Sequence, residues 1–287
     1  MWTGDWQPGW RGIYTLDANV NLQVSPMNTG NMEDSALGYI TFYLRNAPDF
    51  EVNAERIYGM HDALLIPVNS DGDRGIMVEY DIEYPFQYWN AGASWTLLPI
   101  YEYWQCYGNK QIPLNDLVDY SSLKSVLCVE DGGYTDAEMD AVLAKGYLDL
   151  EQDILLPLLT KQANFWEQFM TPEYYMDEDG KACYQKGKTE LEPGETYMLI
   201  PTYSPENHPR GYNSTITANA TNDIAAARDG LSMVIEMEKA VGRQGSEEAI
   251  EKWENLKSLL PKYKYDNTDS GRGALREWAM DEYIENN

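Results

Sequence analysis

Polar side chains recur at every second position in a segment near the start of the chain, between apolar residues. A two-residue period predicts an extended segment with one apolar and one polar face. Asp and Asn are poor strand formers, so a row of them is unusual in an ordinary half-buried strand. An amide both donates and accepts hydrogen bonds, which suits holding water or hydroxyl groups, and a solvated edge strand is the alternative. The polar positions are Asp17, Asn19, Asn21 and Gln23.

A second segment could hold a carboxyl group in a fixed place. Glu206 lies in Ser204-Pro205-Glu206-Asn207, directly after an apolar run that predicts a strand over Thr196–Pro201. Pro205 fixes the backbone before Glu206, and Pro209 stiffens the backbone after it. A carboxyl group held in this way suits general acid catalysis, in which it gives a proton to a departing oxygen. The alternative is an ordinary loop or capping glutamate.

Most of the chain reads as helices that position these two segments. Short apolar stretches and long loops separate the helices, and an Asp-Gly pair at residues 179–180 predicts a hairpin turn. Thr135 is expected to cap its helix, while Gly59 and Gly108 are expected to end theirs. Helices in successive antiparallel pairs predict an α/α toroid with a site in the loops at one end. The first expected helix begins at Asn31 or Glu33 and reaches about Asn46, and the others cover 49–57, 89–107, 135–145, 148–169, 224–240 and 247–260.

The two polar segments together resemble glycoside hydrolase family 95, the inverting α-L-fucosidases and their relatives. Tyr14-Thr15-Leu16-Asp17-Ala18-Asn19 is similar to a Tyr-Thr-Leu-Asn-x-Asn segment of the family, whose two Asn side chains hold the catalytic water. Asn19 matches the second Asn, whereas Asp17 replaces the first. Glu206 falls on the family's general acid, within a Ser-Pro-Glu-Asn segment. Gly273-Ala274-Leu275-Arg276-Glu277-Trp278 resembles a further family segment, Gly-x-Leu-x-Glu-Trp.

The resemblance implies a mainly α fold, an (α/α)6 barrel that forms a single catalytic domain over residues 1–287. It also implies a partial domain, without an upstream β-domain and without the closing helices that carry the family's base. The isolated chain is therefore expected to be a poor or inactive hydrolase. Asp17 is a conceivable substitute base, and a structural pairing with Asn19 is the favoured alternative role. A bacterial, periplasmic or secreted protein is expected, acting on an oligosaccharide or glycan. The expected substrate contacts are Asn21, Trp95, Asn207 and Asp223, with Asp223 equally explained by a helix-opening role.

Composition and charge exclude several other functions. The 47 acidic and 21 basic side chains give a net charge of −26, which disfavours nucleic acid and anionic membrane surfaces. No apolar run approaches the length of a membrane span. The chain has 22 Tyr and 9 Trp but only 5 Phe, and aromatic rings with a polar group suit stacking on sugar rings. A hydrated protein interior or protein interfaces would explain this composition equally well.

No metal or other cofactor is expected. Three scattered cysteines and two histidines form no zinc or disulfide pattern. The run 69–73 resembles the start of a calcium loop but lacks the glutamate that such a loop needs. The three cysteines are Cys106, Cys128 and Cys183, and the two histidines are His61 and His208.

Two other functions stay open. One is a carbohydrate-binding toroid that has kept the pocket and lost the chemistry, which glycan binding without turnover would reveal. The other is a polysaccharide lyase, which needs a cationic pocket that so acidic a chain argues against. The sugar, the linkage and the oligomeric state stay undetermined. Two glycosylation patterns, at Asn213 and Asn219, are expected to be incidental.

Overall fold

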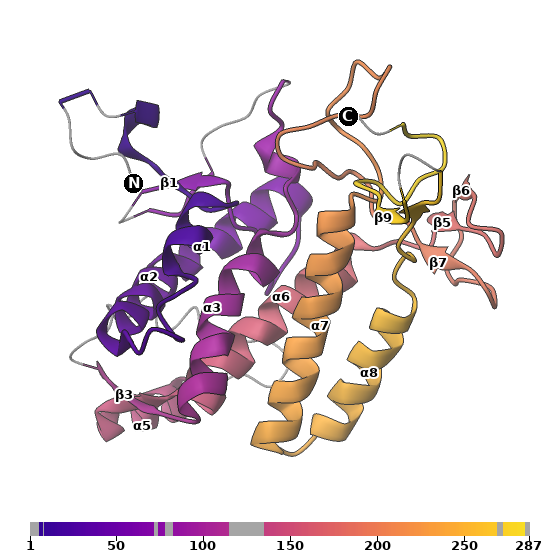
Figure 1. The fold of residues 1–287 in the computed structure, drawn as a ribbon. Helices are drawn as coiled ribbons and strands as arrows, with labels where there is room; N and C mark the ends of the chain where they lie inside the picture. Colours follow the sequence, from indigo (N-terminus) through magenta and orange to yellow (C-terminus); the bar gives the residue numbers. More distant parts are fainter. Residues whose placement is uncertain are drawn as a thin grey trace.

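The protein is mainly helical, with small antiparallel sheets at its edges, consistent with part of a helical toroid (Figure 1). The computed structural model describes residues 6–7, 9–71, 74–77, 83–114, 135–268 and 272–284. The described helices are α1 (Asn19–Val24), α2 (Glu33–Tyr58), α3 (Gly92–Tyr107), α5 (Asp136–Lys145), α6 (Leu156–Phe169), α7 (Thr221–Val241) and α8 (Ser246–Ser258).

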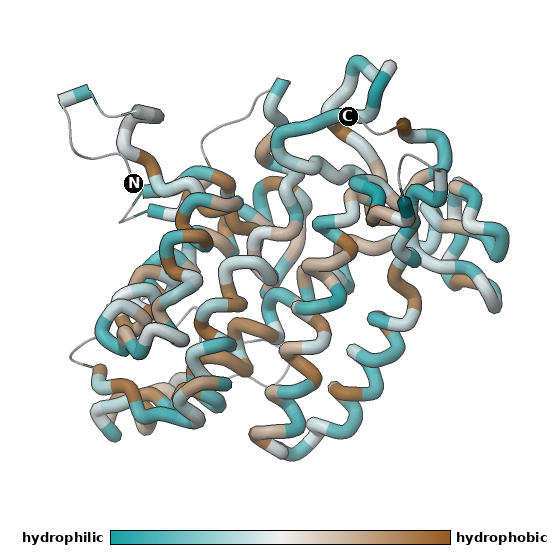
Figure 2. Tube along the Cα trace, in the orientation of Figure 1, coloured by the Kyte–Doolittle hydropathy of each residue, from teal (hydrophilic) through white to brown (hydrophobic). Residues whose placement is uncertain are grey.

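Helix α7 contacts α3, α6 and α8, and these four helices lie side by side in Figure 1. Leu158, Leu159 and Trp166 on α6 are fully buried in the core that the helices share. Hydrophobic residues recur along α3 and α6 in Figure 2, whereas the loop between β7 and α7 is largely hydrophilic. The helical core is thus a scaffold with polar loops at one end.

Helix α7 approaches its neighbours closely at Gly230. A Cβ atom at this position would overlap Gln162 Oε1 and Ser94 Oγ, which are hydrogen-bonded to each other at 2.7 Å. Trp166 Nε1 donates to Ser94 Oγ at 3.1 Å, so the small residue, the amide and the indole form one buried contact. The absence of a side chain at Gly230 therefore allows α3, α6 and α7 to come together.

Gly230→Ala should lower the free energy of unfolding by about 1–3 kcal/mol, the usual cost of overpacking a core. Gly38→Ala is the matched control, since a Cβ atom at this exposed position in α2 would meet nothing within 4 Å. That substitution should be neutral or stabilise by up to about 1 kcal/mol through helix propensity. Urea denaturation of both variants measures the difference, and equal stabilities would contradict the packing argument.

Two helices expected at 33–46 and 49–57 are one helix, α2, and the prediction of a break before Pro48 is wrong. Ala47 and Phe50 are fully buried on either side of Pro48. The Phe50 ring packs edge-on against Tyr43, about two turns earlier, at 5.6 Å between ring centroids. This packing offsets the hydrogen bond that proline removes. Gly59 ends α2 in a left-handed conformation, as predicted.

Other predicted elements are confirmed. Thr135 caps α5 in a capping box with Glu138, and Gly108 ends α3. The predicted hairpin is β5 (Tyr174–Met176) and β6 (Ala182–Tyr184), and β7 (Thr196–Tyr197) pairs with the other edge of β5.

The helix expected over 148–169 instead comprises β4 (Tyr147–Asp149), a π-helical segment (Leu150–Leu155) and α6. Strand β4 pairs with β3 (Gln111–Pro113), and β8 (Tyr265–Asp266) pairs with β9 (Ala274–Leu275).

The predicted extended segment over 11–23 is wrong beyond its first residues. Strand β1 covers only Tyr14–Thr15, paired with β2 (Asn69–Ser70), and α1 begins at Asn19. The reason lies in α3, where Pro99 has no N–H for the carbonyl of Trp95 four residues earlier. Asn21 Nδ2 donates to that carbonyl at 2.9 Å. Asn21 thus supports the proline-containing turn of α3.

Two absences concern only the residues that the structure describes. None of their helices is both long and apolar enough to cross a bilayer. No group of three or more His, Cys, Asp and Glu side chains among them is placed to hold a metal ion. Residues 72 and 73 of the calcium-like run, and Cys128, lie outside the described residues.

Candidate active site

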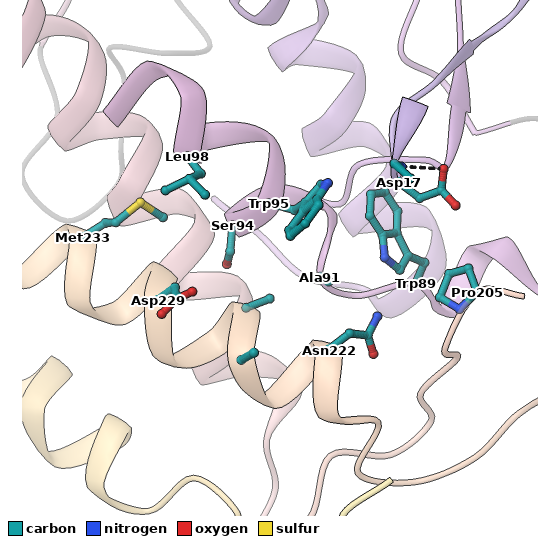
Figure 3. A pocket seen from close by; sticks show the side chains of 13 residues that line it. Asp17, Trp89, Ala91, Ser94, Trp95, Leu98, Pro205, Asn222, Asp229 and Met233 are labelled. Carbon is teal, nitrogen blue, oxygen red and sulfur yellow. Dashed lines mark hydrogen bonds between the residues drawn. The ribbon is translucent and has the colours of Figure 1, made fainter. Parts of the chain in front are cut away.

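Two neighbouring pockets open at the loop end of the helices and share Asp17 and Pro205 in their walls. The larger one, here the carboxylate pocket, has a volume of about 630 Å³. The smaller one, here the tryptophan pocket, has a volume of about 230 Å³ (Figure 3). The carboxylate pocket is lined by Ile13, Thr15, Asp17, Asn19, Val68, Asn69, Tyr84, Phe86, Pro205 and Glu206.

Asp17, in the turn between β1 and α1, and Asn19, the first residue of α1, reach the carboxylate pocket. The backbone before this turn is fixed by the β1–β2 pairing and by the Leu16 N–H, which donates to the Val68 carbonyl at 2.6 Å. Leu16 is buried, so its side chain anchors the turn in the core. Asp17 Oδ1 accepts a hydrogen bond from the Ala18 N–H at 2.8 Å. Asp17 and Asn19 therefore directly follow an anchored segment.

The environment of the Asp17 carboxyl raises its pKa. Burial raises the pKa of Asp17 above its ordinary value, and the negative charge of Glu206 raises it further. The pKa of Tyr203 is raised by its burial, with smaller contributions from Glu206, Tyr84 and Asp17. A carboxylate with a raised pKa is a stronger proton acceptor wherever it is ionised.

A closed loop carries Glu206. At the base of this loop the Leu199 N–H donates to Asn219 Oδ1 and the Asn219 N–H donates to the Leu199 carbonyl, both at 2.8 Å. Next to this pair, Thr202 and Thr217 are joined by two backbone hydrogen bonds and by a hydrogen bond between their hydroxyl groups. The Tyr203 N–H donates to the Tyr88 carbonyl at 3.1 Å, which ties the loop to the segment before α3. These hydrogen bonds fix the loop that carries Glu206, whose side chain is exposed.

The segment Glu277-Trp278 supports the same loop from outside. Trp278 is fully buried, and its Nε1 donates to Thr217 Oγ1 at 3.1 Å. Asn207 Nδ2 donates to Glu277 Oε2 at 2.7 Å. Asn207 lines neither pocket, so its placement indicates a role in holding the loop. The sequence motif contains Glu277 and Trp278, but nothing in its pattern shows that they hold the Glu206 loop.

Asn219 joins several segments at the base of this loop. It is fully buried at a positive φ of 52°. Its Nδ2 lies 3.3 and 3.4 Å from the sulfur atoms of Met176 and Met280. Its carbonyl accepts from the Ala279 N–H at 2.8 Å. The glycosylation pattern at Asn219 is therefore inaccessible in the folded protein.

Asn219→Gly should lower the free energy of unfolding by about 1–3 kcal/mol, because it leaves the buried Leu199 N–H without its acceptor. Glycine keeps the positive φ, so backbone strain does not contribute. Asn213→Gly, at an exposed position in the same loop, is the control and should change stability by less than about 0.5 kcal/mol. Chemical denaturation checks this, and an Asn219→Gly protein as stable as the control would contradict it.

The other residues expected at the site lie apart from the carboxylate pocket. Asn21 is buried and bonded to α3, so a direct substrate contact is not supported. Asp223 is completely buried, burial raises its pKa well above the ordinary value, and Asn90 Nδ2 donates to it at 3.4 Å. Asp223 lines neither pocket and acts in the interior near the start of α7. Trp95 is partly exposed and lines the tryptophan pocket.

Comparison with known families gives one match. Residues 1–126 and 149–287 match the sequence model of the family described as "Glycosyl hydrolase family 95 catalytic domain". Curated protein sequences give no match to this chain. The matched segments include both polar segments that line the carboxylate pocket and the segment that supports the Glu206 loop.

Proposed function

The chain belongs to glycosyl hydrolase family 95, and from this premise we propose that it removes terminal α-linked L-fucose, or a related sugar such as L-galactose, from glycans with inversion. The family membership supports hydrolysis of glycosidic bonds in general. The observation that carries the proposal further is that Glu206, Asp17 and Asn19 line one pocket.

In the proposed reaction the reacting sugar ring lies in the carboxylate pocket. Glu206, on the open side, gives its proton to the glycosidic oxygen as the bond to the anomeric carbon breaks. Asn19 and Asp17 hold a water molecule on the opposite face of the ring. Asp17 accepts a proton from this water as its oxygen bonds to the anomeric carbon. Inverting hydrolysis requires two carboxyl groups that are separated by the sugar and the water in this manner.

Proton balance is complete with these two carboxyl groups. One proton leaves Glu206 for the released alcohol and another enters Asp17 from water. Exchange with solvent then restores both groups, since the carboxylate pocket is open. No metal or cofactor enters this scheme.

The test is sugar release from a panel of glycosides by the protein. The panel contains α-L-fucosides, α-L-galactosides, β-D-galactosides and a uronate-containing polysaccharide. Release from the first or second group supports the proposal. Release from β-D-galactosides alone would refute the proposed sugar, and unsaturated products from the polysaccharide would indicate a lyase.

The replacement of an expected Asn by Asp17 favours one other function, glycan binding without hydrolysis. In that case calorimetry would detect binding of fucosylated oligosaccharides while no sugar is released over days. The same panel therefore separates the two functions.

A further inference from the structure

Glu206 is one of the two central residues of a tight turn. Pro205 and Glu206 lie between Ser204 and Asn207, and the Asn207 N–H donates to the Ser204 carbonyl at 2.8 Å. This hydrogen bond closes the turn, and Glu206 lines the carboxylate pocket. The direction in which the Glu206 side chain leaves the backbone therefore depends on the position of Asn207.

The side chain of Asn207 is held at both ends of its amide group. Its Oδ1 accepts from the His208 N–H at 2.9 Å, and its Nδ2 donates to Glu277 Oε2 at 2.7 Å. The second distance is at the short end of the range for N–H···O bonds, as is usual for a charged acceptor. An ionised carboxylate accepts hydrogen bonds but cannot donate one, so the amide must turn its nitrogen toward Glu277. Glu277 thereby selects the orientation in which Oδ1 meets the His208 N–H.

Glu277 is itself attached to the start of α7. Its carbonyl accepts from the N–H of Thr221, the first residue of that helix, at 2.8 Å. The Thr221 hydroxyl donates to the carbonyl of Arg276 at 2.6 Å, and Trp278 on the other side of Glu277 is fully buried. The backbone that carries the Glu277 carboxylate is therefore fixed to the helical scaffold, so Glu277 is a firm attachment point for Asn207.

Glu277 and Asn207 line neither pocket, so they act on the chemistry through Glu206. A displacement of about 1 Å at a reacting group is enough to lower a rate about 10²-fold. We propose that Glu277 is a positioning residue for proton donation. Its carboxylate, through the Asn207 amide, holds the turn that presents Glu206 to the glycosidic oxygen. This inference rests on the proposed function of Glu206.

Two substitutions at Glu277 test the role of its carboxylate. Glu277→Ala removes the acceptor of the Asn207 amide, whereas Glu277→Gln keeps the size of the side chain and a neutral acceptor. Glu282→Ala is the matched control, because Glu282 is an exposed glutamate in the same C-terminal segment and lines neither pocket. The Glu282 carbonyl, which accepts from Tyr212, stays in place in that variant.

The first measurement is kcat/KM on a natural glycan and on an aryl glycoside with an activated leaving group. Glu277→Ala should lower the value on the glycan about 10–10²-fold. It should lower the value on the aryl glycoside less than about threefold, since that leaving group departs without a proton. Glu277→Gln should stay within about threefold of the parent on both substrates, and Glu282→Ala should match the parent. An unchanged rate of Glu277→Ala on the glycan, or equal losses on both substrates, would overturn the proposal.

A double-mutant cycle tests whether Glu277 acts through Asn207. Asn207→Ala alone should show the same preference for the activated substrate as Glu277→Ala. The double variant should be no slower on the glycan than the slower single variant, because both substitutions break one connection. Losses that multiply in the double variant would show that Glu277 acts by another route and would overturn the proposal.

Hydrogen exchange of the Asn207 N–H, followed by NMR, gives a readout that does not depend on activity. Glu277→Ala should accelerate this exchange about tenfold, the scale of one lost charge-assisted hydrogen bond, while Glu277→Gln and Glu282→Ala should leave it near the parent value. If the parent hydrolyses fucosides and Glu277→Ala matches it in rate and exchange, the positioning role is refuted and the hydrolase proposal stands. If the parent hydrolyses no glycoside, the hydrolase proposal fails, and accelerated exchange in Glu277→Ala still supports the hold of Glu277 on the turn.

Discussion

Glu206→Gln should lower the rate of sugar release from a natural glycan by about 10²–10⁴-fold, the range that general acid catalysis supplies. The amide keeps the size of the side chain but cannot give a proton to the departing oxygen. The loss should be much smaller on an aryl glycoside with an activated leaving group, because that group departs without a proton. Initial rates on both substrates measure the difference.

Glu190→Gln is the matched control for this substitution. Glu190 is an exposed glutamate in the loop between β6 and β7 and lines neither pocket. It should leave both rates unchanged. An undiminished rate of Glu206→Gln on the natural glycan, or equal losses on both substrates, would contradict the assignment of Glu206 as the general acid.

Asp17→Asn should lower kcat by about 10²-fold or more on every leaving group alike, because the amide no longer accepts a proton from water. The pH profile gives a second signature. Burial and Glu206 raise the pKa of Asp17, so its ionisation, and with it the acid-side rise of activity, should occur above the ordinary pH of about 4. The Asn variant should lose this rise.

The raised pKa of Asp17 also predicts an effect on stability. The folded state holds the proton more tightly than the unfolded state, so stability falls as pH rises from the ordinary Asp value through the raised one. Asp17→Asn removes this fall and should be the more stable protein at pH 7. Asp34→Asn, at an exposed position in the first turn of α2, is the control and should change neither activity nor the pH profile. An active Asp17→Asn protein with an unchanged profile would place the proton acceptor elsewhere.

The sequence predicts much of the helical framework because helix signals are local. The capping box of Thr135, the stops at Gly59 and Gly108 and the Asp-Gly hairpin each depend on residues a few positions apart. Their outcome therefore does not depend on the rest of the fold.

The misjudged elements depend on contacts between distant segments. The alternation around Asn21 predicts a strand, but the carbonyl that Pro99 leaves free requires an amide from a short helix 74 positions away. Pro48 stays inside α2 because buried neighbours hold it there. No local pattern contains this information.

In the candidate site, too, some residues could be predicted from local motifs, whereas others depend on contacts between distant segments. The residue types and motifs predicted Asp17, Asn19 and Glu206, and the structure brings these three to one pocket. The sequence could not predict the tryptophan pocket, which arises where faces of α3 and α7 with small side chains meet. Nor could it predict the role of Asn219, whose partners lie 20 to 61 positions away.

The most direct test of the proposed hydrolysis is the anomeric configuration of the first sugar released. Proton NMR of the protein acting on an α-L-fucoside should show β-L-fucose first, with the α-anomer growing later by mutarotation, because water attacks from the side opposite the departing oxygen. Glu206→Gln should remove this signal on a poor leaving group. Initial release of α-L-fucose, or the same early signal from the Glu206→Gln protein, would contradict the roles assigned to Glu206 and Asp17.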